Sequence, residues 1–164
     1  MKTLRIRPLT DEAFAPYGWV AGAAGAVGRP INEGSALRVD GAGALYLTAE
    51  GGAPCLTVFR ARARDPRGPW RVLERHRLGT QTFVPMGGVG YVVLVAAAAD
   101  RPEPATLAAF DVAGDQAVTL HAGTWHHGLI ALADGDFVVI ERKGAGVDCD
   151  VAELPEPVTL LLAA

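Results

Sequence analysis

The chain has few cysteines and no long apolar run. Its two cysteines, Cys55 and Cys149, lie far apart and form no CxxC pair, so they indicate neither a disulfide framework nor a zinc finger. The longest apolar run, Tyr91 to Ala99, is too short to span a bilayer as a helix. Segment 1–7 alternates charged with apolar residues and lacks the apolar core of a signal peptide. We therefore expect a cytoplasmic protein that does not enter the membrane.

An excess of positive charge is also lacking. Fifteen Lys and Arg residues stand against 18 Asp and Glu residues, a formal net charge of −3. This balance argues against nucleic acid or an anionic membrane as a partner. Arginines do gather between Arg60 and Arg77. Because no aromatic residues are interleaved among them, we interpret them as a solvated strand face and loop, from which one or two could face inward and hold an anion.

Long helices are missing as well, whereas turns are common. Twenty glycines and 11 prolines are scattered along the 164 residues, a length that can bury a core without disulfides or metals. Thr10 is suited to cap a short helix over 11–14, and a second helical piece fits 105–110. The other signals are short strands at 44–48, 55–61, 70–78, 82–85, 91–97, 116–121, 125–132 and 137–142. This pattern predicts a single all-β domain over 1–164, a sandwich or barrel, with the apolar tail 158–162 packed on the body or on a partner subunit.

Three of the four histidines lie close together, at His121, His126 and His127, around the turn residue Gly123. Imidazole is a common metal ligand and the usual proton carrier near neutral pH, so such a cluster indicates a site. On a strand, adjacent side chains point to opposite faces, so only one of His126 and His127 can face a barrel interior. We take His126 as the pocket residue. The fourth histidine, His76, shares a strand face with Glu74.

Two segments are similar to cupin motifs. The second cupin motif, P-x-G-x-x-H, is matched with His121 in the proline position and His126 as the metal histidine. The first is matched loosely, with Glu74 in place of the first histidine, His76 as the second and Gln81 in place of the glutamate. The similarity implies a cupin-like jelly-roll β-barrel that holds a divalent metal on His76 and His126 with help from Gln81 and Glu74. Such a donor set suits nickel, zinc, manganese or iron.

A closer resemblance covers nearly the whole chain. The blocks Glu74-Arg75-His76-x-Leu78-Gly79-Thr80-Gln81 and His121-x-x-x-Trp125-His126-His127 resemble those of ureidoglycolate lyases, also called ureidoglycolate hydrolases. The resemblance implies a homodimeric cupin-fold enzyme, a carbon–nitrogen lyase of the amidine-lyase type associated with nickel(II). Its reaction splits ureidoglycolate into glyoxylate and urea in allantoin and purine catabolism. Arg77 and Gly128 stand where the family usually has proline.

The residue types suit this reaction. Ureidoglycolate is a hemiaminal with a carboxylate, and its cleavage needs a base for the hydroxyl proton, an acid for the leaving nitrogen and a cation for the oxygens. We expect His76, His121 and His126 to be catalytic. Gln81 and two arginines at strand ends, Arg60 and Arg142, would bind the substrate, since guanidinium holds a carboxylate through two hydrogen bonds.

Each assignment has a plainer alternative. Either arginine can be a solvated strand end, Glu74 can pair with a strand arginine, and Gln81 can be an ordinary half-buried polar residue. For Cys149 we expect a structural role. Two other functions also fit a histidine-lined cupin pocket. One is a different metal-dependent enzyme that acts on a small acid, and the other is a non-catalytic protein that binds a small molecule.

Overall fold

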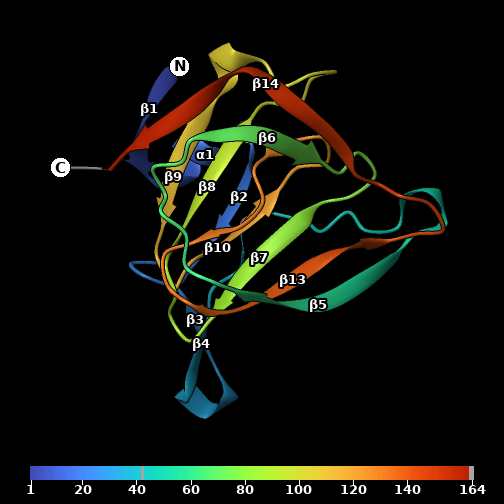
Figure 1. Ribbon diagram of the computed structural model, residues 1–164. Coiled ribbons are helices and arrows are strands. Elements are labelled where there is room, and N and C mark those ends of the chain that lie inside the picture. The colour runs from blue at the N-terminus through green and yellow to red at the C-terminus, as the bar shows by residue number, and fades with distance from the viewer. Residues whose placement is uncertain (42, 163–164) are drawn as a thin grey trace.

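The computed structural model describes residues 1–41 and 43–162, and two β-sheets make up most of it (Figure 1). One sheet runs in the order β11-β6-β14-β1-β9-β8-β12, and because β11 also pairs with β8, six of its strands close into a ring. The facing sheet has the order β2-β10-β7-β13-β5, and β3 and β4 form a separate hairpin. These two layers confirm the expected all-β, cupin-like jelly-roll barrel.

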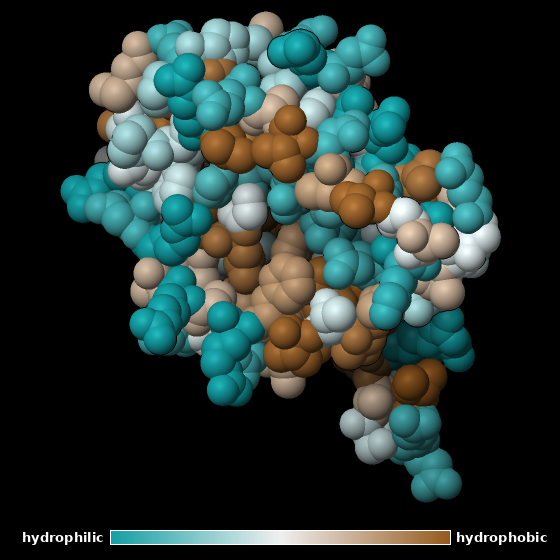
Figure 2. Space-filling model, turned by 45° about the vertical axis from the view of Figure 1, so that its right-hand side comes forward, coloured by the Kyte–Doolittle hydropathy of each residue, from teal (hydrophilic) through white to brown (hydrophobic). Residues whose placement is uncertain are grey.

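The strands are β1 (Lys2–Pro8), β2 (Gly18–Ala21), β3 (Arg29–Ile31), β4 (Ala36–Arg38), β5 (Ala53–Ala61), β6 (Trp70–Arg75), β7 (Gln81–Met86), β8 (Tyr91–Ala96), β9 (Ala108–Val112), β10 (Ala117–Leu120), β11 (Trp125–His126), β12 (Ile130–Ala131), β13 (Gly135–Lys143) and β14 (Asp150–Leu161). The helical pieces are short: α1 (Asp11–Phe14) and the 3₁₀ turns η1 (Asn32–Gly34), η2 (Ala49–Gly51) and η3 (Pro104–Thr106). No helix in the described residues is long and apolar enough to cross a membrane. The β3–β4 hairpin projects from the body, and apolar side chains gather in a hollow of one face (Figures 1 and 2).

The helix α1 begins where its capping residue predicts. The Thr10 hydroxyl accepts the backbone N–H of Ala13 at 3.2 Å, which satisfies one of the amides left free at a helix start. The prediction of a second helix over 105–110 is wrong. A 3₁₀ turn ends at Thr106, and β9 follows with Phe110 and Val112 fully buried. Burial between two layers outweighs the weak local helix preference of this segment.

The core lies on both faces of β8. Tyr91, Val93 and Val95 pack into the space between the two sheets. Their neighbours Val92, Leu94 and Ala96 pack inside the closed ring. Full burial of such a side chain stabilises the fold by roughly 1.5–3 kcal/mol, and a strand buried on both faces is apolar throughout.

Other strand predictions also differ from the structure. Residues 43–48 form no strand; instead Tyr46 and Thr80 exchange hydrogen bonds, Tyr46 N–H to Thr80 Oγ1 at 3.1 Å and Thr80 N–H to the Tyr46 carbonyl at 3.0 Å. The strand expected over 125–132 is interrupted between β11 and β12. Because of that break, Ile130 packs inside the ring together with Trp125 rather than on the face of His126.

The apolar tail was expected to pack either on the body of the protein or on a partner subunit. In the structure it is part of the C-terminal strand β14, which packs on the body. It lies between β1 and β6, and its Val158 and Leu160 are buried inside the ring. The start of the same strand pairs Asp150 with Arg75 at the end of β6. This pairing brings the loop before β14 beside His76.

Candidate metal centre and active site

Glu74, His76 and His126 converge in the space between the sheets. His126 on β11 lies opposite Glu74 on β6, and opposite the core residue Val95 on β8. One ligand atom from each member of the triad lies within 4.8 Å of the others. The His126 Nε2 is 3.5 Å from the Glu74 Oε1, and the two imidazole centroids are 5.5 Å apart. Residues from two separate sequence segments thus meet at one point.

Backbone carbonyls orient both imidazoles. The Nδ1–H of His76 donates to the Asp148 carbonyl at 2.5 Å, and that of His126 donates to the Thr124 carbonyl at 3.1 Å. The Nε2 of each ring is buried without a hydrogen-bond partner in the described part of the chain. An unpaired buried polar atom costs about 1–3 kcal/mol, and metal-binding histidines donate their second nitrogen in this way. The donor set fits a divalent transition metal bound by Glu74, His76 and His126.

The Glu74 carboxylate is held in its ionised form. The nearby His126 ring, 3.5 Å away, lowers its pKa, against the opposing effect of burial. The Cys149 thiol donates to Glu74 Oε2 at 3.7 Å, and burial together with the negative charge of Glu74 raises the pKa of this thiol. Cys149 therefore stays protonated and orients the carboxylate. No sequence motif marks this contact, which arises from the pairing of β6 with β14.

Gln81 lies on β7, in the sheet that faces the triad. Its side chain is buried, and its Nε2 donates to Glu141 Oε2 at 2.9 Å. Its Oε1 is the third buried side-chain atom without a partner among the described residues, beside the two histidine nitrogens. Sequence reasoning missed Glu141. The available signal was strand alternation, because Phe137 and Val139 on β13 are buried and Glu141 continues their face.

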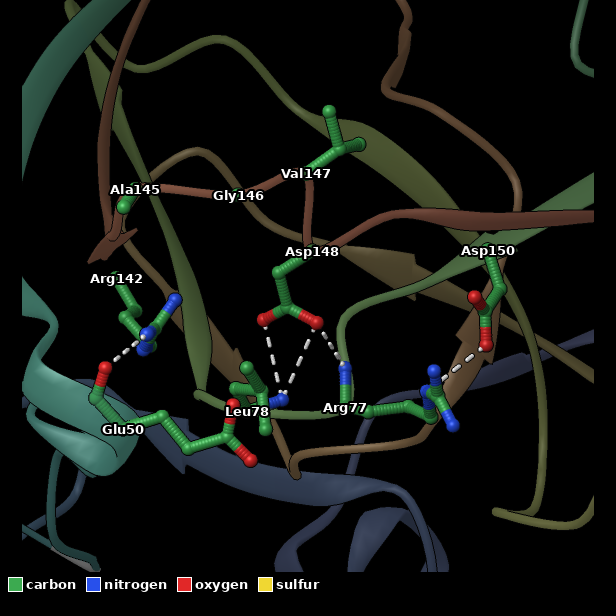
Figure 3. Close-up of a pocket in the computed structure, with 9 residues that line it drawn as sticks. All are labelled: Glu50, Arg77, Leu78, Arg142, Ala145, Gly146, Val147, Asp148 and Asp150. Carbon is green, nitrogen blue, oxygen red and sulfur yellow. Dashed lines mark hydrogen bonds and ion pairs between the residues drawn. The ribbon is translucent and has the colours of Figure 1, made fainter.

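An open pocket of about 470 Å³ begins at Arg77, the residue after His76, and Figure 3 shows Arg77, Leu78, Arg142 and Asp148 around it. A second cavity of about 10 Å³, room for one water molecule, is lined by residues that include His76, Glu141, Arg142 and Asp148. Arg142 and Asp148 line both spaces. The outer pocket is thus adjacent to the cavity that reaches His76.

Arg142 is positioned by its neighbours. Its guanidinium donates from Nε to the Ala49 carbonyl at 2.7 Å and from Nη2 to the Glu50 carbonyl at 3.3 Å, as Figure 3 shows for Glu50. It forms no ion pair with a carboxylate of the described residues. A methyl group at Gly79 would lie 2.7 Å from Arg142 Cβ, so glycine there lets Arg142 lie against the His76 loop.

Arg60 is not brought to this site. In the antiparallel pair of β5 and β13, Arg60 lies opposite Asp136, whereas Arg142 lies opposite Pro54 at the other end. The Arg60 guanidinium is 85% exposed and pairs with Asp136 at 3.0 Å. The pair lowers the pKa of Asp136 through a hydrogen bond. This placement matches the alternative of a solvated strand end.

The His121 side chain lies outside the triad, although the turn that follows it contacts the backbone of His76. Its Nε2 donates to the Ala15 carbonyl at 3.1 Å, and its ring meets Trp19 edge to face at 4.4 Å. The turn that it begins touches His76, because the Gly123 N–H donates to the His76 carbonyl at 2.7 Å. The side chain itself belongs to a separate aromatic contact.

His127 points away from the triad. Its Nδ1–H donates to the Val72 carbonyl at 2.8 Å, and its ring packs on Trp70 at 4.5 Å. Burial lowers the pKa of His127, which favours the neutral ring. The structure therefore separates the two adjacent histidines as alternation requires, with His126 toward the site.

Comparison with known proteins agrees with this geometry. The family model described as ureidoglycolate lyase matches residues 1–161. A ureidoglycolate lyase of Burkholderia mallei (strain NCTC 10229) is 42% identical over 161 residues, which cover 98% of this chain and 94% of the relative. A ureidoglycolate lyase of Stutzerimonas stutzeri (strain A1501) is 39% identical over 163 residues, which cover 99% of this chain and 96% of the relative. One of Pseudomonas entomophila (strain L48) is 37% identical over 163 residues, which cover 99% of this chain and 98% of the relative. The chain belongs to the ureidoglycolate lyase family.

Proposed function

We propose that this protein is a ureidoglycolate lyase that cleaves ureidoglycolate to glyoxylate and urea. The observation that carries the proposal, beside family membership, is a set of three buried polar atoms without partners among residues 1–41 and 43–162. They are His76 Nε2, His126 Nε2 and Gln81 Oε1, all on residues of the two family-specific blocks. Buried polar atoms are normally hydrogen-bonded, so these three support a site for a metal and a substrate here.

We propose Glu74, His76 and His126 as the metal ligands and assign Gln81, which the sequence also offered as a ligand, to substrate binding. A bound divalent metal supplies a Lewis acid for the hydroxyl and carboxylate oxygens of the substrate. Nickel(II) is our choice among the metals that this donor set suits. Metal analysis of the purified protein tests it, and a protein that is fully active without bound metal would contradict it.

Residues of the chain would bind the substrate carboxylate and transfer the protons. Arg142, held at the wall of the outer pocket by two carbonyls, would bind the substrate carboxylate through two parallel hydrogen bonds. We propose His121 as the proton-transfer group, supported by the contact between its turn and the His76 backbone. The hydroxyl proton leaves, its oxygen becomes the carbonyl of glyoxylate, and the nitrogen takes the C–N electron pair and a proton and departs as urea. Arg60, remote from this wall, has no role in this scheme.

The same proposal includes a single-domain homodimer in the cytoplasm. Exposed apolar side chains on the outer face of β5, Leu56 at 66% and Val58 at 54%, offer a surface for a second copy. Both cysteines are free, as is usual in a reducing compartment. Light scattering should give twice the chain mass, and a monomer at micromolar concentration would contradict the dimer. One cooperative unfolding transition would support a single domain.

The activity has a direct test. Purified protein is incubated with ureidoglycolate, and glyoxylate, urea and ammonium are each measured. Glyoxylate and urea in equal amounts are expected. Ammonium without urea would indicate a different reaction at the same site, and the absence of any product would contradict the proposal.

A further inference from the structure

Glu141 is a carboxylate in an unusual position. It continues the inward face of β13 after the buried residues Phe137 and Val139, and it lines the small cavity together with His76. It forms no ion pair with a cation of the described residues. A partly buried carboxylate without a cationic partner is costly, which indicates a role other than stability.

A hydrogen bond to this carboxylate fixes the amide of Gln81. Glu141 is directly opposite Gln81 in the β13–β7 register, and the Gln81 Nε2 donates to it at 2.9 Å. The reversed amide would place two oxygens against each other, because an ionised carboxylate only accepts hydrogen bonds. Gln81 Oε1 therefore turns away from Glu141, and it is left buried with no donor from the part of the chain that the structure describes.

The pair thus presents hydrogen-bond acceptors only. A suitable ligand must bring several N–H or O–H donors and must carry no negative charge at this end. Ureidoglycolate has such a group at one end, since its ureido NH₂ and NH are donors on two nitrogens bonded to the same carbonyl carbon. Two N–H groups of that shape can donate side by side to a carboxylate, as guanidinium does.

We propose that Gln81 and Glu141 form the subsite that binds the ureido end of the substrate, an inference that rests on the proposed function. Glu141 repels the carboxylate of the substrate, and Arg142 on the wall of the same cavity attracts it. The two side chains together set the direction in which the substrate lies. The subsite would reject molecules that keep the carboxylate but lack the terminal NH₂.

Binding to unreactive ligands tests this subsite. N-carbamoylglycine is the substrate without its hydroxyl group, and N-acetylglycine has a methyl group in place of the terminal NH₂. Calorimetry with the metal-loaded enzyme should show N-carbamoylglycine binding about 10- to 100-fold more tightly, the range of a hydrogen bond to a charged group. In Glu141→Gln this preference should fall to about twofold or less, while N-acetylglycine binds at least as tightly as before.

Glu50→Gln is the matched control. Glu50 is exposed at the outer pocket, so its variant removes the same charge without removing an acceptor beside Gln81. It should keep the full preference. Metal content of Glu141→Gln should equal that of the wild type.

Equal binding of both ligands by the wild type would overturn the proposal, and so would an undiminished preference in Glu141→Gln. A loss of metal in Glu141→Gln, with both ligands weakened alike, would overturn it too and make Glu141 a metal ligand. The comparison of the two ligands on the wild type does not depend on the folding of any variant. Because it measures binding without turnover, its result is independent of the activity assay, so a failure of the subsite and a failure of the proposed lyase activity can be told apart.

Discussion

Asp148 holds His76 and the residues that follow it at three points. Its carbonyl accepts His76 Nδ1–H at 2.5 Å. Its carboxylate accepts the backbone N–H of Arg77 at 2.8 Å and of Leu78 at 3.1 Å, as Figure 3 shows. Residues that lie 70 or more positions apart in the chain thereby fix one imidazole. The sequence predicted a strand that continues to Leu78, but β6 ends at Arg75. This contact explains the difference, because the amides of Arg77 and Leu78 bind a side chain instead of a neighbouring strand.

Asp148→Ala should therefore weaken the site without removing a ligand. We expect a loss of about 10- to 100-fold in metal affinity or turnover, the usual effect of removing a group that orients a metal ligand. Asp150→Asn is the control, because Asp150 pairs with Arg75 and Arg77 and no hydrogen bond joins it to His76. Metal titration and steady-state kinetics measure both variants, and equal losses in the two would argue against a specific role for Asp148.

His126 and His127 give a sharper comparison, since they are neighbours with opposite directions. His126→Ala removes a proposed ligand and should lower turnover at least ~100-fold, the scale of one lost acid–base or metal contact. His127→Ala removes packing on Trp70 and should mainly lower the melting temperature. Turnover, metal content and thermal unfolding are measured for each. A lethal His127→Ala beside a mild His126→Ala would reverse the assignment.

The triad could be predicted from the sequence because its signals are local. Glu74 and His76 alternate on one strand, and His126 follows a glycine turn at motif spacing. The facing sheet could not be predicted in this way. Glu141 has no motif, and its position depends on the register of β13 against β7.

The two arginines show the same limit. Arg60 and Arg142 are equivalent by sequence, each at the end of an apolar strand. Only the antiparallel pairing of β5 with β13 places them at opposite ends of the sheet. The break between β11 and β12 likewise depends on tertiary contacts, such as the hydrogen bond from His127 N–H to the Leu94 carbonyl at 2.9 Å, which no local propensity encodes.

Arg142→Lys should raise KM for ureidoglycolate about 10-fold or more and change the melting temperature little. Lysine keeps the charge but loses the two parallel hydrogen bonds that guanidinium makes with a carboxylate. Arg60→Lys, at the far end of the same strand pair, should leave both kcat and KM unchanged. Steady-state kinetics at fixed ionic strength compare the two, and a KM effect of Arg60→Lys equal to that of Arg142→Lys would remove the support for a carboxylate site at Arg142.

Tyr91 gives a prediction for alkaline stability. Its ring is fully buried between the sheets and its hydroxyl donates to the Phe83 carbonyl at 3.3 Å. Burial raises the pKa of Tyr91 far above its ordinary value, which is about 10 in an unfolded chain. The unfolded state therefore loses this proton first as the pH rises, and the stabilisation, complete below pH ~10, decreases by about 1.4 kcal/mol for each further pH unit until the folded pKa is reached.

Tyr91→Phe removes this titration and one hydrogen bond. At pH 8 the variant should be about 0.5–1.5 kcal/mol less stable than the wild type, and this difference should shrink or reverse between pH ~10 and ~11. Tyr46→Phe is the control, because Tyr46 is 61% exposed and its removal should leave the alkaline slope unchanged. Guanidinium unfolding at several pH values measures all three proteins. Parallel slopes for the wild type and Tyr91→Phe above pH ~10 would mean that the Tyr91 hydroxyl does not limit stability there, because both states would then release its proton together.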